Sequence, residues 1–411
     1  MPRIKAFNSY LVKADRAINV VSPAYDSVSP EQRREFAEAN PENFINTMRL
    51  QEDFPEARKP TYKQLLGSNK ERLTHLLGNG SYEALHQPCM FLYQLGSGEH
   101  IQIGIVCEVA VSEYEQGKLR KHENTSSAKE DLLAQYQEVV GASSSPICLA
   151  YAQNPAIDKY IGKLSSRTPD LDFVTNDGEI QRVWCINDPD ELEHLRQLFA
   201  DISATYLTDG HHRAASGRRY AELMRNKHNS NHGDEPYNQL LVALFPDNQL
   251  NLLPFHRCVK DMNSLDTQQL LTALNKHFKV EPVPSAVQPD CHGEFGMLIE
   301  GNWYRLTVKS PHTDNNSPVN CLDVSILQNL VLDPVFGIKD MRDDPRLGYI
   351  AGVSGIEGIN QTVSEGWEVV FTCNATSIQQ LMDVADADAL MPPKSTYFDP
   401  KPRSGIFVRI K

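Results

Sequence analysis

Five consecutive residues, Asp209-Gly210-His211-His212-Arg213, have side chains of the types that handle phosphate groups. Arginine offers a planar fork of donors, histidine donates hydrogen bonds or moves protons near neutral pH, and glycine lets a ligand approach the backbone. An aspartate can hold Mg²⁺, which prefers one or two carboxylates together with substrate phosphate. We therefore expect a phosphate-binding site at this run, with Asp209 as the metal ligand.

The residues on either side of this run predict a strand, a tight loop and a helix. Residues 204–208 are strand-prone, and Ala214, Gly217 and Ala221 recur on one helical face. This arrangement presents backbone N–H groups and the positive end of a helix dipole to an anion. The alternative is an ordinary helix start with core histidines, but complementary polar groups crowded into so short a run favour a functional site.

A second polar segment is Arg120-Lys121-His122-Glu123-Asn124-Thr125. Its basic residues suit an anionic ligand, and Glu123 could serve as a general base or as a metal ligand. A charged, solvated turn in which Thr125 or Ser126 caps the next helix explains the same residues equally well.

Composition and charge restrict the class of protein. The chain has 411 residues, enough for two or three lobes, and 40% of them are hydrophobic. The net charge of −13 repels a polyanion, so nucleic acid is a disfavoured partner. No apolar signal core opens the sequence and no run approaches the ~20 apolar residues of a membrane span, which predicts a cytoplasmic protein without a membrane partner.

The cysteines predict neither disulfides nor a metal knuckle. The sequence has 8 of them, scattered singly and without a C-x-x-C pair, which is typical of reduced thiols in a cytoplasmic protein. Cys258, beside His256 and Arg257, is kept as a candidate for reactivity.

Strand-like and helix-like segments alternate along the chain, which predicts a mixed α/β (α+β) fold. Ser29-Pro30-Glu31-Gln32 predicts a capped helix start, and turns at 176–178 and 301–302 predict hairpins. The exposed segment 310–319 indicates a boundary, with a main α/β domain at 1–310 that contains the 204–224 site and a C-terminal α/β region at 311–411 on the same core.

Several motifs resemble one family when taken in order along nearly the whole chain. They are Ser22-Pro23-Ala24-Tyr25-Asp26, His122-Glu123-Asn124-Thr125, Thr208-Asp209-Gly210-His211-His212-Arg213, Leu253-Pro254-Phe255-His256-Arg257 and Met391-Pro392-Pro393-Lys394-Ser395-Thr396-Tyr397-Phe398 with Pro400-Lys401-Pro402. This set is identified with the bacterial and archaeal family catalogued as a domain of unknown function, number one thousand and fifteen.

Residues 204–224 are also similar to the phosphate loop of ParB/sulfiredoxin-like proteins. The resemblance implies phosphate contacts by the residues of the 210–213 loop, with Asp209 on magnesium or the substrate hydroxyl. Histidine stands where sulfiredoxins have their catalytic cysteine, and the arginine pair of ParB is missing. The free-serine kinases of this group fit best, so the expected architecture is a ParB/sulfiredoxin-like nucleotide site embedded in a larger fold of two or three lobes.

The predicted function is a nucleotide-dependent phosphotransferase, a kinase acting on a small hydroxyl-bearing metabolite such as a free amino or hydroxy acid. The expected cofactor is Mg²⁺ with ATP or ADP. Asp209 or Glu123 would position the acceptor hydroxyl, while Arg213 and His212 would stabilise the transferring phosphoryl group.

Arg257 and Lys394 are secondary candidates for phosphate contacts made from distant segments. Two alternative functions stay open: a metal-dependent hydrolase or phosphatase with Asp209, His211 and His212 as ligands, and a non-catalytic nucleotide-binding regulatory protein. The sequence leaves the acceptor, the choice of nucleotide and the oligomeric state open.

Overall fold

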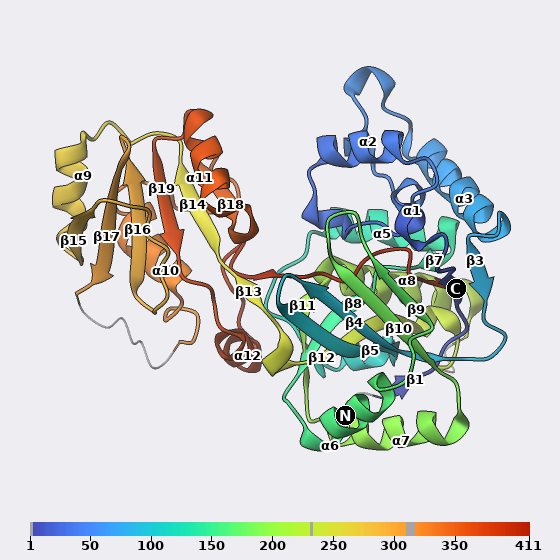
Figure 1. Cartoon of the computed structure of the whole chain (residues 1–411). Coiled ribbons are helices and arrows are strands. Elements are labelled where there is room, and N and C mark those ends of the chain that lie inside the picture. Colours follow the sequence, from blue (N-terminus) through green and yellow to red (C-terminus); the bar gives the residue numbers. More distant parts are fainter. Residues whose placement is uncertain (1–2, 231–232, 310–316) are drawn as a thin grey trace. The chain divides into compact units, whose positions relative to one another are not determined.

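The computed structural model of the chain describes residues 3–230, 233–309 and 317–411 (Figure 1). By its internal contacts the chain forms two compact units, one of Met1–Leu250 with Pro400–Lys411 and one of Asn251–Asp399. Each unit is built from sheets with helices between the strands, so the chain is a mixed α/β protein.

The unit limits differ from the boundary expected at residue 310. Residues 310–316, on which that boundary falls, lie outside the described residues. Strands on both sides of that segment belong to one sheet, because β16 (Glu294–Ile299) pairs with β19 (Val369–Cys373). The second unit is therefore an insertion between residues 250 and 400.

The first unit is organised around a nine-stranded sheet in which β6, β11, β8, β12, β5, β4, β10 and β9 follow one another and β1 also pairs with β5. Its strands are β1 (Ile4–Lys5), β4 (Met90–Ser97), β5 (His100–Ala110), β6 (Leu119–Arg120), β8 (Ile147–Tyr151), β9 (Leu171–Val174), β10 (Ile180–Ile186), β11 (Thr205–Asp209) and β12 (Gln239–Pro246). A four-stranded sheet combines β2 (Tyr10–Val12), β3 (Tyr82–Ala84), β7 (Ala142–Ser143) and β21 (Phe407–Ile410).

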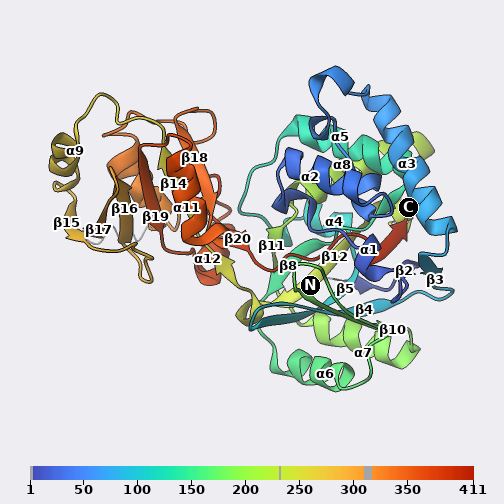
Figure 2. The same cartoon turned by 45° about the horizontal axis from the view of Figure 1, so that its top comes forward.

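Both faces of the large sheet are buried. Met90 and Leu92 belong to one apolar cluster and their neighbours Phe91 and Tyr93 to another, because successive side chains of a strand point to opposite faces. Helices α6 and α7 lie on one side of the strands and α2, α3 and α5 on the other (Figures 1 and 2). The helices of this unit are α1 (Ala17–Val20), α2 (Pro30–Ala39), α3 (Tyr62–Gly78), α4 (Val111–Glu115), α5 (Ser127–Val140), α6 (Pro155–Ser165), α7 (Pro189–Ala200) and α8 (His211–His228).

Local sequence signals account for several element ends. The helix expected after Ser29-Pro30 is confirmed as α2, where the side chains of Ser29 and Gln32 form a reciprocal capping box. The hairpins expected at 176–178 and 301–302 are confirmed as β9–β10 and β16–β17. Helix α3 begins at Tyr62 in the same way, because Thr61 and Gln64 form a second capping box.

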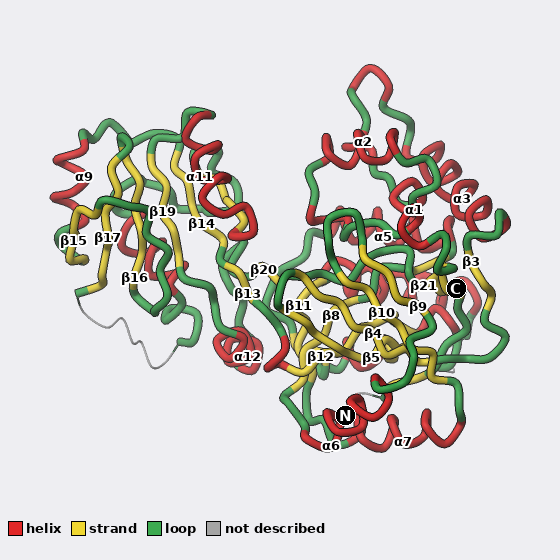
Figure 3. The backbone as a smooth tube through the Cα atoms, in the orientation of Figure 1, coloured by secondary structure: helices red, strands yellow, loops and turns green. Residues whose placement is uncertain are grey.

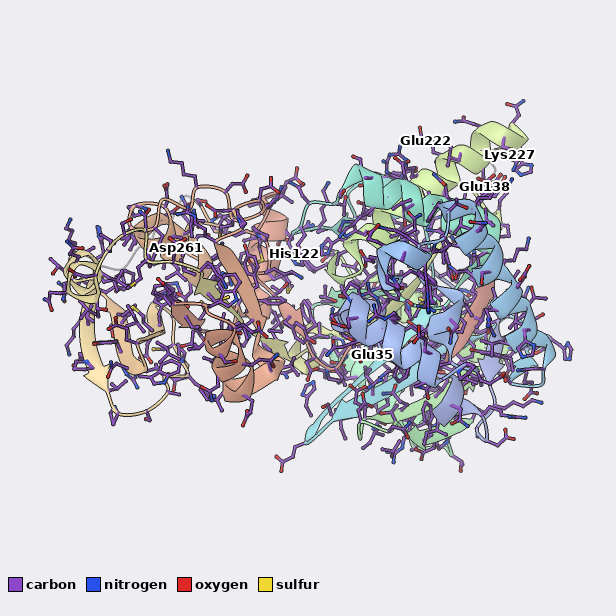
Figure 4. The ribbon with its side chains drawn as sticks, turned by 90° about the horizontal axis from the view of Figure 1, so that it is seen from above. Glu35, His122, Glu138, Glu222, Lys227 and Asp261 are labelled. Carbon is purple, nitrogen blue, oxygen red and sulfur yellow. The ribbon has the colours of Figure 1, made fainter. Side chains whose placement is uncertain are left out.

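Helices α5 and α8 pack against each other beside the sheet, and the start of α8 is the candidate site. An ion pair of 2.9 Å between Lys227 Nζ and Glu138 Oε1 joins the helices where α8 ends (Figure 4). Ser216 of α8 receives a hydrogen bond from Gln137 of α5 at 3.0 Å. The buried hydrogen bond between Gln137 and Ser216 holds α8 against α5, and the exposed ion pair adds a second contact at the end of α8.

The second unit contains a six-stranded antiparallel sheet in the order β15-β17-β16-β19-β14-β18 (Figure 3). Its core is apolar and includes Phe278, Phe295, Phe336 and Phe371, which are fully buried. Its elements are β13 (Leu252–Leu253), β14 (Phe255–Val259), α9 (Thr267–Leu274), β15 (Phe278–Val283), β16, β17 (Asn302–Val308), α10 (Asp323–Leu327), β18 (Leu347–Ala351), α11 (Gly355–Ser364), β19, α12 (Ile378–Asp386) and β20 (Tyr397–Phe398).

Across the described residues, no helix combines the length and the apolar character needed to cross a membrane.

The C-terminal segment 400–411 belongs to the first unit and is held there by two buried arginines. Arg403 donates to Asp177 and Glu179 of the β9–β10 turn. Arg409 Nε donates to Glu108, and both side chains are almost fully buried. Burial raises the pKa of Glu108, and the charge of Arg409 opposes that rise.

Replacing Arg409 with methionine is expected to destabilise the first unit by about 3–5 kcal/mol, because Glu108 then remains as an uncompensated buried charge. The double variant Arg409→Met, Glu108→Gln should regain part of this loss. Urea unfolding measures the free energy of unfolding of the single and the double variant. Arg182→Met, which removes an exposed ion pair with Asp172, is the control and should cost less than about 1 kcal/mol. Equal losses of unfolding free energy in Arg409→Met and in the control would contradict the conclusion that Arg409 compensates the buried charge of Glu108.

Candidate phosphate-binding site

Strand β11 ends at Asp209, Gly210 is the N-cap of α8, and the helix begins at His211. Gly210 has φ = 91°, a left-handed conformation that favours glycine. A Cβ atom at this position would lie 2.9 Å from Nε of Arg213. No side chain of the described residues caps this end of α8, so its first-turn N–H groups are not bound by a capping side chain.

Asp209 holds two cations with its two carboxylate oxygens. Oδ2 accepts from Nη2 of Arg213, and Oδ1 accepts from Nζ of Lys401 at 3.0 Å. Arg213 also donates from Nη1 to the carbonyl of Pro146 at 2.6 Å. Burial alone would raise the pKa of Asp209, but the charges of Lys401 and Arg213 outweigh it and hold the pKa well below its ordinary value.

Two buried histidines lie beside this ion-pair cluster. His122 and His211 meet edge to face with ring centroids 4.5 Å apart, and Nδ1 of His211 is 3.6 Å from Oε2 of Glu123. Burial lowers the pKa of His211 to about 4, with a smaller opposing effect of Asp209. Burial also places the pKa of His122 well below its ordinary value. Both rings are therefore neutral at pH 7, and the cationic groups of the cluster are Arg213 and Lys401.

His212 faces the start of α5. Its Nε2 accepts a hydrogen bond from the backbone N–H of Ser126 at 3.1 Å, which places the ring proton on Nδ1. Ser126 occupies the N-cap position of α5, but its side chain makes no capping hydrogen bond. The 120–126 segment is thus more than a capped turn, since it contributes Glu123, His122 and a backbone contact to the α8 N-terminus.

The structure brings most of the expected site residues together in the first unit. Asp209, His211, His212 and Arg213 lie on the strand–loop–helix, and Glu123 contacts His211. Arg257 and Lys394 belong to the second unit. Their proposed role at the 209–213 loop stays a prediction.

Two residues of the cluster, Lys401 and His122, carry too little local signal to be predicted as site residues from the sequence. Both stand in family motifs, Pro400-Lys401-Pro402 and His122-Glu123-Asn124-Thr125. The local feature that could have indicated a functional role for Lys401 is its position between two prolines in a protein of net charge −13. Nothing local indicates which distant carboxylate it pairs with.

The arrangement does not fit a magnesium ion on Asp209. Both of its oxygens already face cationic nitrogen atoms of Arg213 and Lys401, and a divalent cation there would be repelled by both. The three side chains expected to hold a transition metal also diverge, because His211 faces Glu123 and His212 faces Ser126. Within the described ranges, no group of three or more His, Cys, Asp or Glu side chains is arranged to hold a metal ion.

The fold and the site define a mixed α/β protein with a cationic loop at the N-terminus of a helix. Over residues 4–325 the sequence matches the family described as "Protein of unknown function (DUF1015)", and the chain belongs to this family. No curated protein matches the sequence.

Among solved structures, the chain is distantly similar to a free serine kinase in complex with AMP, at 13% identity and a TM-score of 0.37 over 74% of this chain and 91% of that one. A mutant free serine kinase in complex with ADP matches at 13% identity and a TM-score of 0.36 over 76% and 94% of the two chains. SbnI with C-terminal truncation from Staphylococcus aureus matches at 11% identity and a TM-score of 0.39 over 74% and 87%. A TM-score in this range does not carry a function from one protein to another.

Replacing Asp209 with asparagine is expected to lower the free energy of unfolding by about 3 kcal/mol at pH 7, because Arg213 and Lys401 lose their shared counter-charge. A carboxylate with a lowered folded-state pKa contributes stability above its unfolded pKa of about 3.9, and this contribution is lost as the pH falls toward the folded value. The difference between wild type and Asp209→Asn should therefore shrink below about pH 4. Urea unfolding between pH 3 and pH 7 measures it, and a difference that does not change with pH would contradict the ion-pair assignment.

Replacing Gly210 with alanine is expected to cost more than the same change at Gly178. The two glycines have similar φ values, 91° and 88°, but a Cβ at Gly178 meets nothing within 4 Å whereas one at Gly210 meets Arg213. Gly178→Ala should show the backbone cost of about 1–2 kcal/mol alone. Equal losses of unfolding free energy in the two variants would show that the Arg213 contact is unimportant.

Proposed function

We propose that the protein is a nucleotide-dependent phosphotransferase that places a nucleotide phosphate at the 209–213 loop and transfers a phosphoryl group to a small hydroxyl-bearing metabolite, such as a free amino or hydroxy acid. One observation carries this proposal. A mostly buried carboxylate, Asp209, whose side chain is 12% exposed, holds Arg213 and Lys401 next to the N-terminus of α8, which lacks a side-chain cap.

Each part of this arrangement favours a phosphate. Backbone N–H groups in the first turn of a helix bind anions, and the helix dipole adds to the attraction. Arg213 offers its planar fork and Lys401 a compact charge. Asp209 neutralises only one of these two charges, so the cluster of three side chains keeps a net positive charge in a protein whose net charge is −13.

Glu123 is the better carboxylate for the acceptor hydroxyl. Asp209 is bound by two cations and its pKa is lowered, so it is a weak base. The side chain of Glu123 is 35% exposed and lies next to the neutral ring of His211. In the proposed step the acceptor oxygen attacks phosphorus, the bond from phosphorus to the nucleotide oxygen breaks, and the hydroxyl proton passes to Glu123.

In this proposal His212 donates a hydrogen bond to the phosphate, and His211 is a neutral neighbour of Glu123. His212 carries its proton on Nδ1, from which it would donate to a phosphate oxygen. A neutral His211 keeps Glu123 from being locked in a strong ion pair. The nucleotide, ATP or ADP, would arrive with its own Mg²⁺ bound to the phosphates, because Asp209 does not fit as a ligand for that ion.

The first test is calorimetric titration with ATP and with ADP, each with and without Mg²⁺, on the wild type and on Arg213→Ala. We expect Arg213→Ala to lose at least tenfold in affinity, because a charge-assisted contact of this kind contributes about 1.5–3 kcal/mol. Arg196→Ala, which removes an exposed arginine of α7, should bind like the wild type. Absence of binding to every nucleotide would refute the phosphate-loop proposal.

Phosphorus NMR with a pool of small hydroxy and amino acids then tests turnover. A new phosphomonoester signal is expected in the wild type. Glu123→Gln should bind nucleotide within about twofold of the wild type and lose turnover by about 10²–10⁴-fold, as expected when a general base is removed. Nucleotide binding without product in the wild type would instead indicate a non-catalytic regulatory protein.

A further inference from the structure

Arg257 is a fully buried arginine of the second unit, with 0% of its surface exposed. It lies on β14, the strand next to the edge strand β18, opposite Tyr349 of β18 and Phe371 of β19. Its Nη1 donates to the carbonyl of Phe255 at 2.6 Å, and its Nη2 donates to the carbonyl of Pro393 at 3.2 Å. The buried Nε has no hydrogen-bond partner among the described residues.

These partners are neutral. No aspartate or glutamate of residues 3–230, 233–309 or 317–411 forms an ion pair with Arg257, and only Cys373 and Tyr349 favour its charged form electrostatically. Buried charges are normally paired, because an uncompensated charge in the protein interior is strongly unfavourable. The bonds to two carbonyl oxygens satisfy donors but supply no counter-charge.

A second cation, Lys394, is the next residue along the chain from Pro393, whose carbonyl accepts from Arg257. Nζ of Lys394 is 5.2 Å from the centre of the Phe255 ring, the same residue whose carbonyl binds Arg257. Lys394 has φ = 55°, a left-handed conformation that is costly for a residue with a side chain. Its turn is held by the bonds of Ser395 Oγ to the Pro392 carbonyl and of Thr376 Oγ1 to the Ser395 carbonyl.

The sheet topology also places the N-terminus of a helix at the end of the sheet where β14 begins. Strand β14 begins at Phe255, and β19 runs antiparallel to it, so the C-terminal end of β19 lies at the same end of the sheet. Helix α12 begins shortly after β19, with its N-cap at Ser377. Its positive end, Arg257 and Lys394 therefore lie at one end of the sheet, where Phe255 and Tyr349 provide partly exposed aromatic walls.

We propose that Arg257 and Lys394 form an oxyanion-binding site in the second unit, which takes a phosphate or carboxylate group. The anion replaces the Pro393 carbonyl on Nη2, the longer of the two bonds of Arg257, and accepts from the unpartnered Nε as well. Lys394 contacts the same anion from the turn. The observations behind this site all lie in the second unit, so the proposal does not rest on the proposed phosphotransferase activity, and it assigns Arg257 and Lys394 a role other than the one predicted for them at the 209–213 loop.

The test uses the full chain with Arg213→Ala, so that the loop in the first unit binds the anion at least tenfold more weakly. Inorganic phosphate and, separately, acetate are titrated by calorimetry, and the rise in melting temperature is followed in parallel. We expect one anion per chain, with affinity falling at least tenfold in Lys394→Gln and further in Arg257→Met. A response to phosphate alone assigns a phosphate group, and a response to acetate alone assigns a carboxylate.

Lys260→Gln is the matched control, since Nζ of Lys260 also lies 5.2 Å from an aromatic ring, that of Trp367, in the same unit. It should bind the anion like the parent chain. Equal affinities in Lys394→Gln and Lys260→Gln, or no binding of either anion, would overturn the proposal. Lys394 is exposed and its side chain forms no hydrogen bond in the described structure, so Lys394→Gln decides the matter even where Arg257→Met fails to fold. Loss of nucleotide binding at the loop would leave this result unchanged.

Discussion

The ion pairs of Asp209 with Arg213 and Lys401 fix the geometry on which the candidate site depends. One carboxylate joins the end of β11, the first turn of α8 and the C-terminal segment, and Arg213 extends the connection to Pro146. Because the carboxylate is mostly shielded from water, its bonds to the two cations are stronger than at the surface, and each cation is held with little freedom. The positions of the two cations are thus set before any ligand binds, which reduces the entropy lost on binding.

The neighbouring residues keep this charge pattern intact. His122 and His211 are held neutral by burial, so they add no positive charge that would compete with Arg213 and Lys401 for Asp209. Glu123, the second carboxylate of the candidate site, faces a neutral ring. A strongly ionised, immobile aspartate and a more accessible glutamate can serve different purposes, one structural and one chemical.

Buried arginines in the two units differ in their partners. Arg403 and Arg409 of the first unit each contact a carboxylate, and these pairs attach the C-terminal segment to the large sheet. Arg257 of the second unit is buried more completely and contacts two backbone carbonyls. An arginine that only stabilised the fold would be expected to have its charge compensated, which is why we assign Arg257 a ligand rather than a structural pairing.

The sequence by itself determined the features that depend on neighbouring residues. Ser29 and Gln32 set the start of α2, the turns at 176–178 and 301–302 set two hairpins, and Gly210 between a strand and a helix indicated the loop, because capping, turn conformation and periodicity act over a few residues. Only the tertiary structure decided that Lys401 pairs with Asp209, 192 positions earlier, and that Glu123 meets His211. It also decided that residues 251–399 form a separate unit. Such pairings depend on which strands lie next to each other in the sheet. The residues of a strand specify which of its faces is buried, but they do not specify which distant segment lies beside it.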